Sequence, residues 1–338
     1  IGSVAGYDLT DGPGNVLIGK SAGAAMTTGD HNVAIGMNAA LTMVGEGDNN
    51  IAIGKNSLST EKLGADQCIA IGHNALLTQS HADCKNLAIG ADAGKLITSG
   101  TKNVLIGHKA GTALVDDSEN TAVGFESLMT AQSTGNTAFG YFAGREVATG
   151  AYNTLLGSYA MANADGGETE NTAIGYAALY NLDSDTADGN TALGESAGRY
   201  TPDGGAGTAM TLAINSCYIG KDTNSVAAAG ATNEIVIGYG TVGNGSNTIT
   251  LGNTSIVSGG FHCQQALTVD SDKRIKRDII NDDTGLALIE KLQPVTYKPV
   301  NPADYPEAIA DPRFTEFTTQ ELVTAAVEAA EAVYEDAI

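Results

Sequence analysis

A short pattern of polar, small and apolar positions recurs along most of the chain. A typical copy is Asn-Thr-Ala-Ile-Gly at residues 171–175, in which a polar residue is followed by a β-branched residue, an alanine, a large apolar residue and a glycine. The glycine recurs at Gly2, Gly19, Gly36, Gly54, Gly72, Gly90, Gly107, Gly124, Gly140, Gly157, Gly175 and Gly194. The mean spacing is about 17.5 residues, and a short fixed period is typical of a fold built from stacked repeats.

The residues before each glycine predict a β-strand of about four residues. Counted from the glycine, position −1 is large and apolar, position −2 is mostly alanine, and position −3 is β-branched or leucine. Side chains alternate along a strand, so positions −1 and −3 share one face and the alanine lies on the other. A strand that is apolar on both faces is expected to be buried on both. One face can line the core of the coil, and we expect the alanine face to pack against a neighbouring subunit.

Two further positions indicate how successive coils meet. The glycine is expected where the chain turns and a side chain would not fit. The asparagine at position −4 begins the strand, and in stacked coils its amide is expected to form a ladder with its counterparts. The sequence therefore predicts an all-β repeat fold whose coils are in register.

The repeat resembles the Asn-x-Ala-Ile-Gly repeats in the heads of trimeric autotransporter adhesins. It is more similar still to the Asn-Thr-Ala-Ile-Gly-Tyr-x-Ala-Leu arrays of phage tail fibres and related surface proteins. The resemblance covers residues 1–258 and implies a homotrimeric parallel β-roll or β-helix of about 17-residue coils. The chain starts inside a coil at Ile1 and Gly2, so we expect an N-terminal attachment region, the link to a virion or cell-surface protein, to precede this sequence.

Composition and charge argue against several classes of function. The chain of 338 residues has a formal net charge of −22, which argues against binding to nucleic-acid backbones or to anionic membrane surfaces. No run approaches the length of 18 apolar residues, so no membrane insertion is predicted. There is no tryptophan, and only 5% of the residues are aromatic. A roll closed by Ile, Val and Ala needs few aromatic residues, whereas a compact globule of this length normally has more.

The cysteines, histidines and acidic turns predict no cofactor and no metal site. Cys68 occupies an asparagine position and Cys84 stands two residues before Asn86, an offset that disfavours a disulfide between neighbouring coils. Cys217 and Cys263 have no matched partner, and no Cys-x-x-Cys motif is present. The five histidines are scattered through different positions of the repeat. The acidic turns lack the spaced ligands of a dedicated calcium loop, so they are interpreted as solvated turns.

The composition changes at Ser271. Seven of the 17 basic residues and five of the seven prolines lie after it, in only 67 residues. We therefore divide the chain into a repeat domain at 1–258, a connector at 259–271 and a small C-terminal α+β domain at 272–338. This domain is expected to contain helices at 283–292 and 319–336 and a short strand at 295–298. The second helix either packs on its own small domain or joins a trimeric helical bundle.

The start of this domain carries the one motif with catalytic chemistry. Residues 271–276 read Ser-Asp-Lys-Arg-Ile-Lys, which resembles the Ser-Asp-x-Arg-x-Lys motif of the C-terminal intramolecular chaperone domain of phage endosialidases and tail fibres. The family trimerises, templates the fibre before it and then cuts itself off. The resemblance implies that Ser271 is the nucleophile, Lys276 the general base, and the bond between Ser271 and Asp272 the one that is cut, with Arg274 completing the motif.

This chemistry is physically reasonable, because a serine becomes nucleophilic when a lysine of lowered pKa takes its proton. Neighbouring positive charge, as from Arg274, would help to lower the lysine pKa. The chain departs from the family in lacking a Gly-x-x-Ala-Gln-Glu segment before its last helix. Autoproteolysis by a Ser271–Lys276 dyad is therefore left open, and no activity on an external substrate is expected.

Taken together, these features favour a structural and adhesive homotrimeric fibre of a phage tail or another virion appendage, which binds a glycan or protein of a host surface. The alternative is a trimeric adhesin of a bacterial cell surface. A glycan-cleaving spike is a third interpretation. It is disfavoured because glycosidases use two carboxylates beside a cleft, and no such pair stands out among the acidic turn residues.

Overall fold

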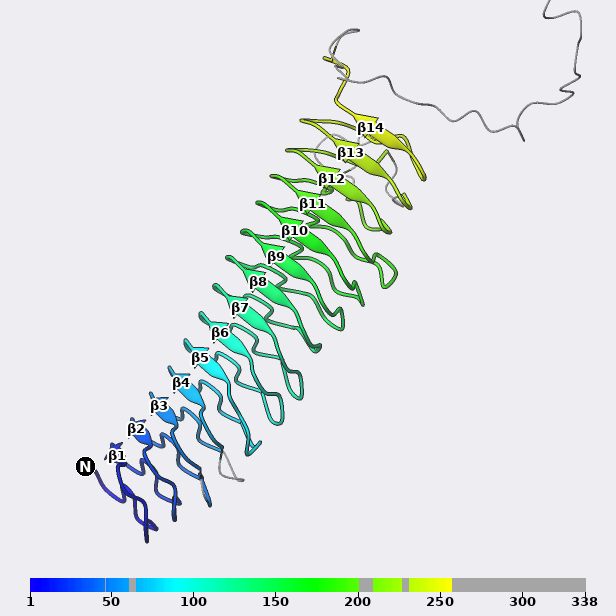
Figure 1. Cartoon of the computed structure of the whole chain (residues 1–338). Coiled ribbons are helices and arrows are strands. Elements are labelled where there is room, and N and C mark those ends of the chain that lie inside the picture. Colours follow the sequence, from blue (N-terminus) through cyan, green and yellow to red (C-terminus); the bar gives the residue numbers. More distant parts are fainter. Residues whose placement is uncertain (46, 61–64, 201–208, 227–230, 257–338) are drawn as a thin grey trace, which may run out of the picture. The chain divides into compact units, whose positions relative to one another are not determined.

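The computed structural model describes residues 1–45, 47–60, 65–200, 209–226 and 231–256, all within one compact unit. These residues form a parallel β-solenoid, in which each turn of the chain adds one short strand to a single sheet (Figure 1). The sheet has fourteen strands in chain order. The predicted parallel repeat fold is thereby confirmed for the described residues.

The strands have three residues each, one fewer than expected, and they occupy positions −3 to −1 of the repeat. They are β1 (Val16–Ile18), β2 (Val33–Ile35), β3 (Ile51–Ile53), β4 (Ile69–Ile71), β5 (Leu87–Ile89), β6 (Val104–Ile106), β7 (Thr121–Val123), β8 (Thr137–Phe139), β9 (Thr154–Leu156), β10 (Thr172–Ile174), β11 (Thr191–Leu193), β12 (Cys217–Ile219), β13 (Ile235–Ile237) and β14 (Ile249–Leu251).

Equivalent positions of successive coils are paired throughout the sheet. Ile53 lies opposite Ile71, which in turn lies opposite Ile89, as the repeat predicted. From β1 to β11 the paired residues are 16 to 19 positions apart in the sequence. The next step, from Thr191 to Cys217, is 26 positions, because the coil carries a long insertion. The strand register is kept while the rest of the coil varies.

The glycine at position 0 is required by the stacking of the coils. Gly90 has a φ of +138°, a conformation that residues with side chains rarely adopt. A Cβ atom added to Gly90 would collide with the carbonyl oxygen of Gly107 in the next coil. The turn after each strand therefore brings the backbones of neighbouring coils into direct contact, as the sequence predicted.

The alanine face of the strands lines the interior of the coil, so the prediction that it packs against another subunit is wrong. Ala122 and Ala138 are fully buried within the single chain, and the strand residues on either side of them are half-buried in β7 and exposed in β8. The reason is the thinness of the coil. The interior also receives the side chains at positions +3 and +4 from the opposite wall, such as Ser127 and Leu128, which leaves room for little more than a methyl group on the strand.

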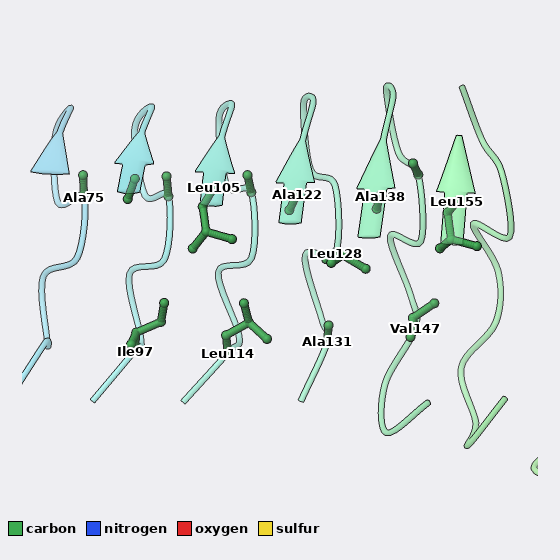
Figure 2. Packing of buried hydrophobic residues seen from close by; sticks show 14 of the residues in the cluster. Ala75, Ile97, Leu105, Leu114, Ala122, Leu128, Ala131, Ala138, Val147 and Leu155 are labelled. Carbon is green, nitrogen blue, oxygen red and sulfur yellow. The ribbon is translucent and has the colours of Figure 1, made fainter. Parts of the chain in front are cut away.

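Large and small residues complement one another along this core (Figure 2). In β7 the small Ala122 is combined with a large residue, Leu128, at position +4 of the same coil. In β6 the order is reversed, because Leu105 at position −2 is combined with Gly111 at position +4. A Cβ atom added to Gly111 would lie 2.7 Å from Leu105 Cδ2, and one added to Gly94 in the preceding coil would lie 2.8 Å from Leu105 Cδ1. Leu105 thus fills the space that two glycines leave open.

The predicted asparagine ladder is present and buried. The backbone N–H of Asn103 donates to Oδ1 of Asn86 in the preceding coil at 2.8 Å, and that of Asn120 donates to Oδ1 of Asn103 at 2.9 Å. The side-chain amide of Asn103 donates to the carbonyl oxygen of Asp117 at 2.9 Å. Each asparagine therefore satisfies backbone groups of the following coil that would otherwise be buried without a partner.

Cys68 interrupts the ladder and forms a disulfide with Cys84, so the prediction against this disulfide is wrong. The two Cα atoms are 5.7 Å apart. Asparagines of the ladder donate to the carbonyl three residues before the next asparagine, as Asn32 does to Gly47, three residues before Asn50. Cys84 stands directly after the equivalent carbonyl in its own coil, two residues before Asn86. The two-residue offset is thus the normal reach of this side chain, and the disulfide replaces one link of the ladder.

Most of the expected C-terminal features lie outside the described residues. These are the connector at 259–271, the α+β domain at 272–338, and the helices and strand expected within it. The described part of the repeat domain ends at Ile256. The domain boundaries therefore stay predictions.

Candidate interaction surfaces

The residues predicted to cleave the chain lie outside the described residues. Ser271, Asp272, Arg274 and Lys276 all belong to the segment from residue 257 onward. The Ser271–Lys276 dyad and its cut stay predictions from the motif. The described residues instead offer three exposed features, which are the outer face of the sheet, the corner that follows it, and a group of acidic turns.

The outer sheet face, defined as positions −1 and −3 of β1 to β14, is apolar and partly open to solvent. The side chain of Phe139 is 54% exposed and that of Ile249 is 68% exposed. Other exposed apolar residues on this face are Val16, Ile18, Leu156, Leu193, Ile237 and Leu251. A continuous row of apolar side chains in the single chain is typical of a surface that binds another protein surface.

Polarity changes along the outer sheet face. Position −3 is aliphatic in the first six strands, as in Val33 and Ile51, and is threonine from β7 to β11, as in Thr137. Position −1 stays large and apolar through the same strands. The face therefore keeps one continuous apolar row beside a second row that becomes polar in the middle of the sheet.

The corner after the turn glycine consists of positions +1 and +2, and in the early coils position +2 is polar, from Ser21 to Asp92. The side-chain amide of Asn38 donates to Oδ1 of Asn56 at 3.1 Å, and that of Asn56 donates to Oδ1 of Asn74 at 3.2 Å. The amide of Asn74 donates to Asp92 Oδ1 at 3.0 Å. Position +2 has a positive φ, as in Asn56 with +57°, and asparagine adopts this conformation more readily than most residues.

From β6 to β10 the same corner carries aromatic rings. We name it the aromatic ridge, made of His108, Phe125, Tyr141, Phe142, Tyr159 and Tyr176 at positions +1 and +2, together with Tyr180 at position +5, whose ring centroid lies 6.0 Å from that of Tyr159. Neighbouring ring centroids are 5.0 Å apart from His108 to Phe125, 5.5 Å from Phe125 to Tyr141, 5.4 Å from Tyr141 to Tyr159 and 5.9 Å from Tyr159 to Tyr176. The repeat pattern did not predict this ridge, although aromatic residues directly after four of the turn glycines signal it.

Charged groups accompany the rings. Glu126 is largely buried beside the ridge and forms ion pairs with Arg145 Nε at 3.1 Å and with Lys109 Nζ at 3.8 Å. The Arg145 guanidinium also lies over the ring of Phe142, 4.7 Å from its centroid, a cation–π contact. Desolvation raises the pKa of Tyr159, and the neighbouring Tyr141 adds to the shift. The hydroxyl of Tyr159 therefore stays protonated at neutral pH.

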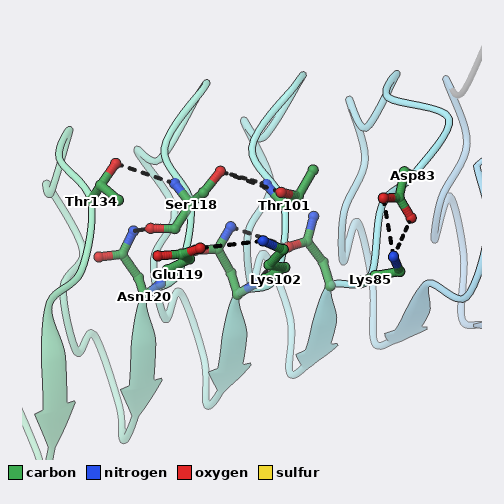
Figure 3. Close-up of polar contacts among 10 residues, drawn as sticks. Asp83, Lys85, Thr101, Lys102, Ser118, Glu119, Asn120 and Thr134 are labelled. Atoms are coloured by element: carbon green, nitrogen blue, oxygen red, sulfur yellow. Dashed lines mark hydrogen bonds and ion pairs between the residues drawn. The ribbon is translucent and has the colours of Figure 1, made fainter.

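Polar contacts between coils continue on the loop side of the asparagine ladder (Figure 3). The backbone N–H of Thr101 donates to Ser118 Oγ at 3.0 Å. Lys102 and Glu119 form an exposed ion pair at 3.3 Å between neighbouring coils, and exposed pairs of this kind add little stability. These contacts align the loops without creating a concave site.

Carboxylates of successive turns meet at one corner of the later coils. A hydrogen bond with Asp165 raises the pKa of Asp183 to about 6, with desolvation and repulsion by Asp165 and Asp185 adding to it. Burial raises the pKa of Glu168, whose Oε1 accepts from the backbone N–H of Ser184 at 2.8 Å. Among the described residues, no three His, Cys, Asp or Glu side chains are grouped to hold a metal ion. This corner therefore binds protons more readily than isolated carboxylates do.

A cavity near β14 contains no carboxylate. Its lining residues are Gly240, Val242, Thr250, Gly252, Asn253 and Thr254. Hydrolysis of a glycosidic bond ordinarily needs two carboxyl groups across the substrate, so this cavity provides no support for a glycan-cleaving spike.

Comparisons with known proteins give no family for this chain. No protein-family model, curated protein or solved structure matches it. No helix long and apolar enough to cross a bilayer occurs in the part of the chain that the structure describes. The function is therefore inferred from the geometry of the solenoid and from the sequence motifs.

Proposed function

We propose that the chain is a structural and adhesive fibre, in which three parallel solenoids form a homotrimer on a phage tail or another virion appendage and contact a host surface. The observation that carries the proposal is the apolar outer sheet face, which runs over all fourteen strands and is partly exposed in the single chain. A trimeric adhesin of a bacterial cell surface is the alternative, and it would use the same apolar face as the contact between subunits.

A trimer buries the outer sheet face in a simple way. Three copies around one axis parallel to the solenoid can each turn this face inward, so that equivalent coils meet at the same height. Residues such as Phe139, Leu156 and Leu193, open to solvent in the single chain, would then lie in a shared core. This assignment replaces the alanine face as the proposed contact between subunits.

Other features suit an extended surface protein. The asparagine ladder and the parallel pairing link each coil to the next, which favours a stiff rod. The net charge of −22 keeps a long particle soluble. Binding to the host surface, a glycan or a protein, is expected at exposed corners and loops, where function usually resides on a repetitive scaffold.

The C-terminal segment is proposed to template this assembly. Parallel pairing among three chains brings together distant parts of the sequence, and such folding is slow and exposes strand edges. The motif at 271–276 supports a chaperone-like domain at 272–338 that trimerises first and can then release itself by the Ser271–Lys276 reaction. Truncation before residue 272 is therefore expected to yield aggregated chains.

The decisive experiment measures the mass of the purified full chain at micromolar concentration, together with two charge substitutions. Phe139→Glu lies on the outer sheet face, and Tyr152→Glu is a matched control at an exposed position outside it. We expect a trimer for the wild type and for Tyr152→Glu, and for Phe139→Glu a trimer that dissociates at a lower denaturant concentration, because the other strands and the C-terminal domain still hold the subunits. A wild-type chain that stays folded and monomeric would contradict the proposal.

The genes that neighbour the gene for this chain distinguish a virion appendage from a cell-surface adhesin. Neighbouring tail or baseplate genes would support a virion appendage. A secretory signal and a membrane anchor in the extended reading frame would instead support a cell-surface adhesin.

A further inference from the structure

We propose that the aromatic ridge, from His108 to Tyr180, is the surface that recognises the host, and that its ligand is a linear, uncharged glycan lying along the stack of coils. This inference rests on the proposed adhesive function and adds the residues and the ligand class. Its central observation is a row of stacked and edge-on rings that extends over five successive coils.

The spacing of the rings fits a ligand with a repeating unit. One aromatic side chain or more is supplied by each coil, and consecutive centroids are 5.0 to 5.9 Å apart. The rings of His108, Phe125 and Tyr141 stack on one another, so they turn their edges and the Tyr141 hydroxyl, rather than their faces, toward solvent. A polymer of sugars can place the hydroxyls of successive units along this row of edges, which a compact ligand cannot do.

The fold itself does not require aromatic residues at this corner. Phe142 and Tyr159 have positive φ values of +57° and +61°, and bulky residues adopt this conformation at a cost. In earlier coils the same position is held by Asn56 and Asn74, which suit the conformation and bond to each other. Both rings are half-buried and pack against the exposed rings of Tyr141 and Tyr176, so we interpret them as supports for the rings that face solvent.

The polar groups around the rings favour an uncharged ligand. The carboxylate of Glu126 is already neutralised by Arg145 and Lys109, so the ridge presents no unpaired cluster of one sign for a polyanion. The hydroxyls of Tyr141 and Tyr176, on side chains that are 44% and 51% exposed, can donate to and accept from sugar hydroxyls. The net charge of −22 further repels acidic polymers.

The ridge is also poorly suited to contact another copy of this chain. Arg145 and Lys109 keep part of their side chains in water while paired with Glu126, and a subunit contact would remove that water at a large desolvation cost. The outer sheet face lies before the turn glycine and the ridge after it, so the proposed trimer contact uses different side chains.

The test titrates the full chain with three neutral linear hexasaccharides: maltohexaose, cellohexaose and chitohexaose. Binding is followed by calorimetry and by tyrosine fluorescence, which is undisturbed because the chain has no tryptophan. The variants are Tyr141→Ala and Tyr176→Ala. The matched control is Tyr239→Ala, because Tyr239 is 68% exposed at the same position after a glycine of a later coil, outside the ridge.

We expect at least one hexasaccharide to bind, with affinity lowered about fivefold by each ridge substitution, as for loss of one hydrogen-bonding group, and unchanged by Tyr239→Ala. Absence of binding by all three sugars, or equal weakening by Tyr239→Ala, would overturn the inference. Dissociation of the trimer by Tyr141→Ala would assign the ridge to subunit contact and overturn it as well. A monomeric chain that binds through the ridge would refute the trimer but not this inference.

Discussion

The size complementarity of the core can be tested by giving one coil the arrangement of another, with a small residue at position −2 and a large residue at position +4. The perturbation combines Leu105→Ala with Gly111→Leu, which gives the coil of β6 the arrangement seen one coil later in Ala122 and Leu128. Both single variants should be destabilising, whereas the double variant should recover part of the loss. The test is specific because each half of the exchange is harmful alone.

The magnitudes follow from the packing. Leu105 is fully buried, and truncation of such a leucine to alanine costs about 2–5 kcal/mol. A Cβ atom at Gly111 would lie 2.7 Å from Leu105 Cδ2 and 2.8 Å from Leu114 Cδ1, so Gly111→Leu overpacks the core at a cost of about 1–3 kcal/mol. The backbone does not forbid the leucine, since Leu128 has a φ of +48° where Gly111 has +57°.

In the double variant the new side chain at position 111 enters the space vacated by Leu105. The space beside Gly94, which Leu105 also fills, stays partly empty, so recovery is incomplete. We expect the double variant to be more stable than the sum of the single effects predicts, by a coupling of about 1–3 kcal/mol.

The assay is denaturant unfolding of the full chain, followed by circular dichroism at one protein concentration and one incubation time, because stability of an oligomer depends on concentration. Leu96→Ala, at an exposed leucine in the preceding coil, is the control and should change stability by less than about 0.5 kcal/mol. Strictly additive effects of Leu105→Ala and Gly111→Leu would refute the complementarity.

Three other outcomes are expected. Replacing Cys68 and Cys84 by serine should cost about 3 kcal/mol, since the disulfide closes a loop with a sequence separation of 16; no change in unfolding midpoint on adding reductant would contradict its role. Asp183 has a folded-state pKa of about 6 against an ordinary value of 3.8, so the folded state binds the proton more tightly and its stability falls as pH rises through that window. Asp183→Asn should therefore raise the unfolding midpoint at pH 7 and flatten its dependence on pH, and a midpoint that is lower than wild type would contradict this. Ser271→Ala and Lys276→Ala should each leave one uncut band on a denaturing gel while trimers still form, and a wild-type chain that stays intact after long incubation would count against self-cleavage.

Much of the fold could be predicted from the repeat, because glycine, asparagine and the short apolar run each have one local role that recurs in every coil. Which face of the strand lies inside could not be predicted in the same way. Alternation shows that Ala122 points away from Thr121 and Val123, but the choice between inside and outside depends on the distance to the opposite wall. That distance is set by residues such as Leu128, six positions later in the chain, and not by the strand.

The candidate surfaces were less predictable for a related reason. The link between Cys68 and Cys84 depends on how far a side chain reaches beyond the sheet, which a comparison of strand positions alone does not capture. The aromatic ridge depends on rings such as Phe125 and Tyr159 that occupy different positions, +1 and +2, in their own coils. They become neighbours only when the coils are stacked. Inspection of one repeat position at a time therefore shows isolated aromatic residues and no ridge.

The pairing of sizes in the core also governs how the length of the solenoid can change in evolution. Ala52 with Leu58 and Ala70 with Leu76 are successive coils of the same kind, so an extra copy of the Ala52 coil would meet familiar neighbours, keep the Cys68–Cys84 disulfide and lengthen the rod by about 4.8 Å. The coil containing Gly94 depends instead on Leu105 of the next coil. Insertions should therefore be tolerated as single coils in the first region and only as pairs of coils in the second.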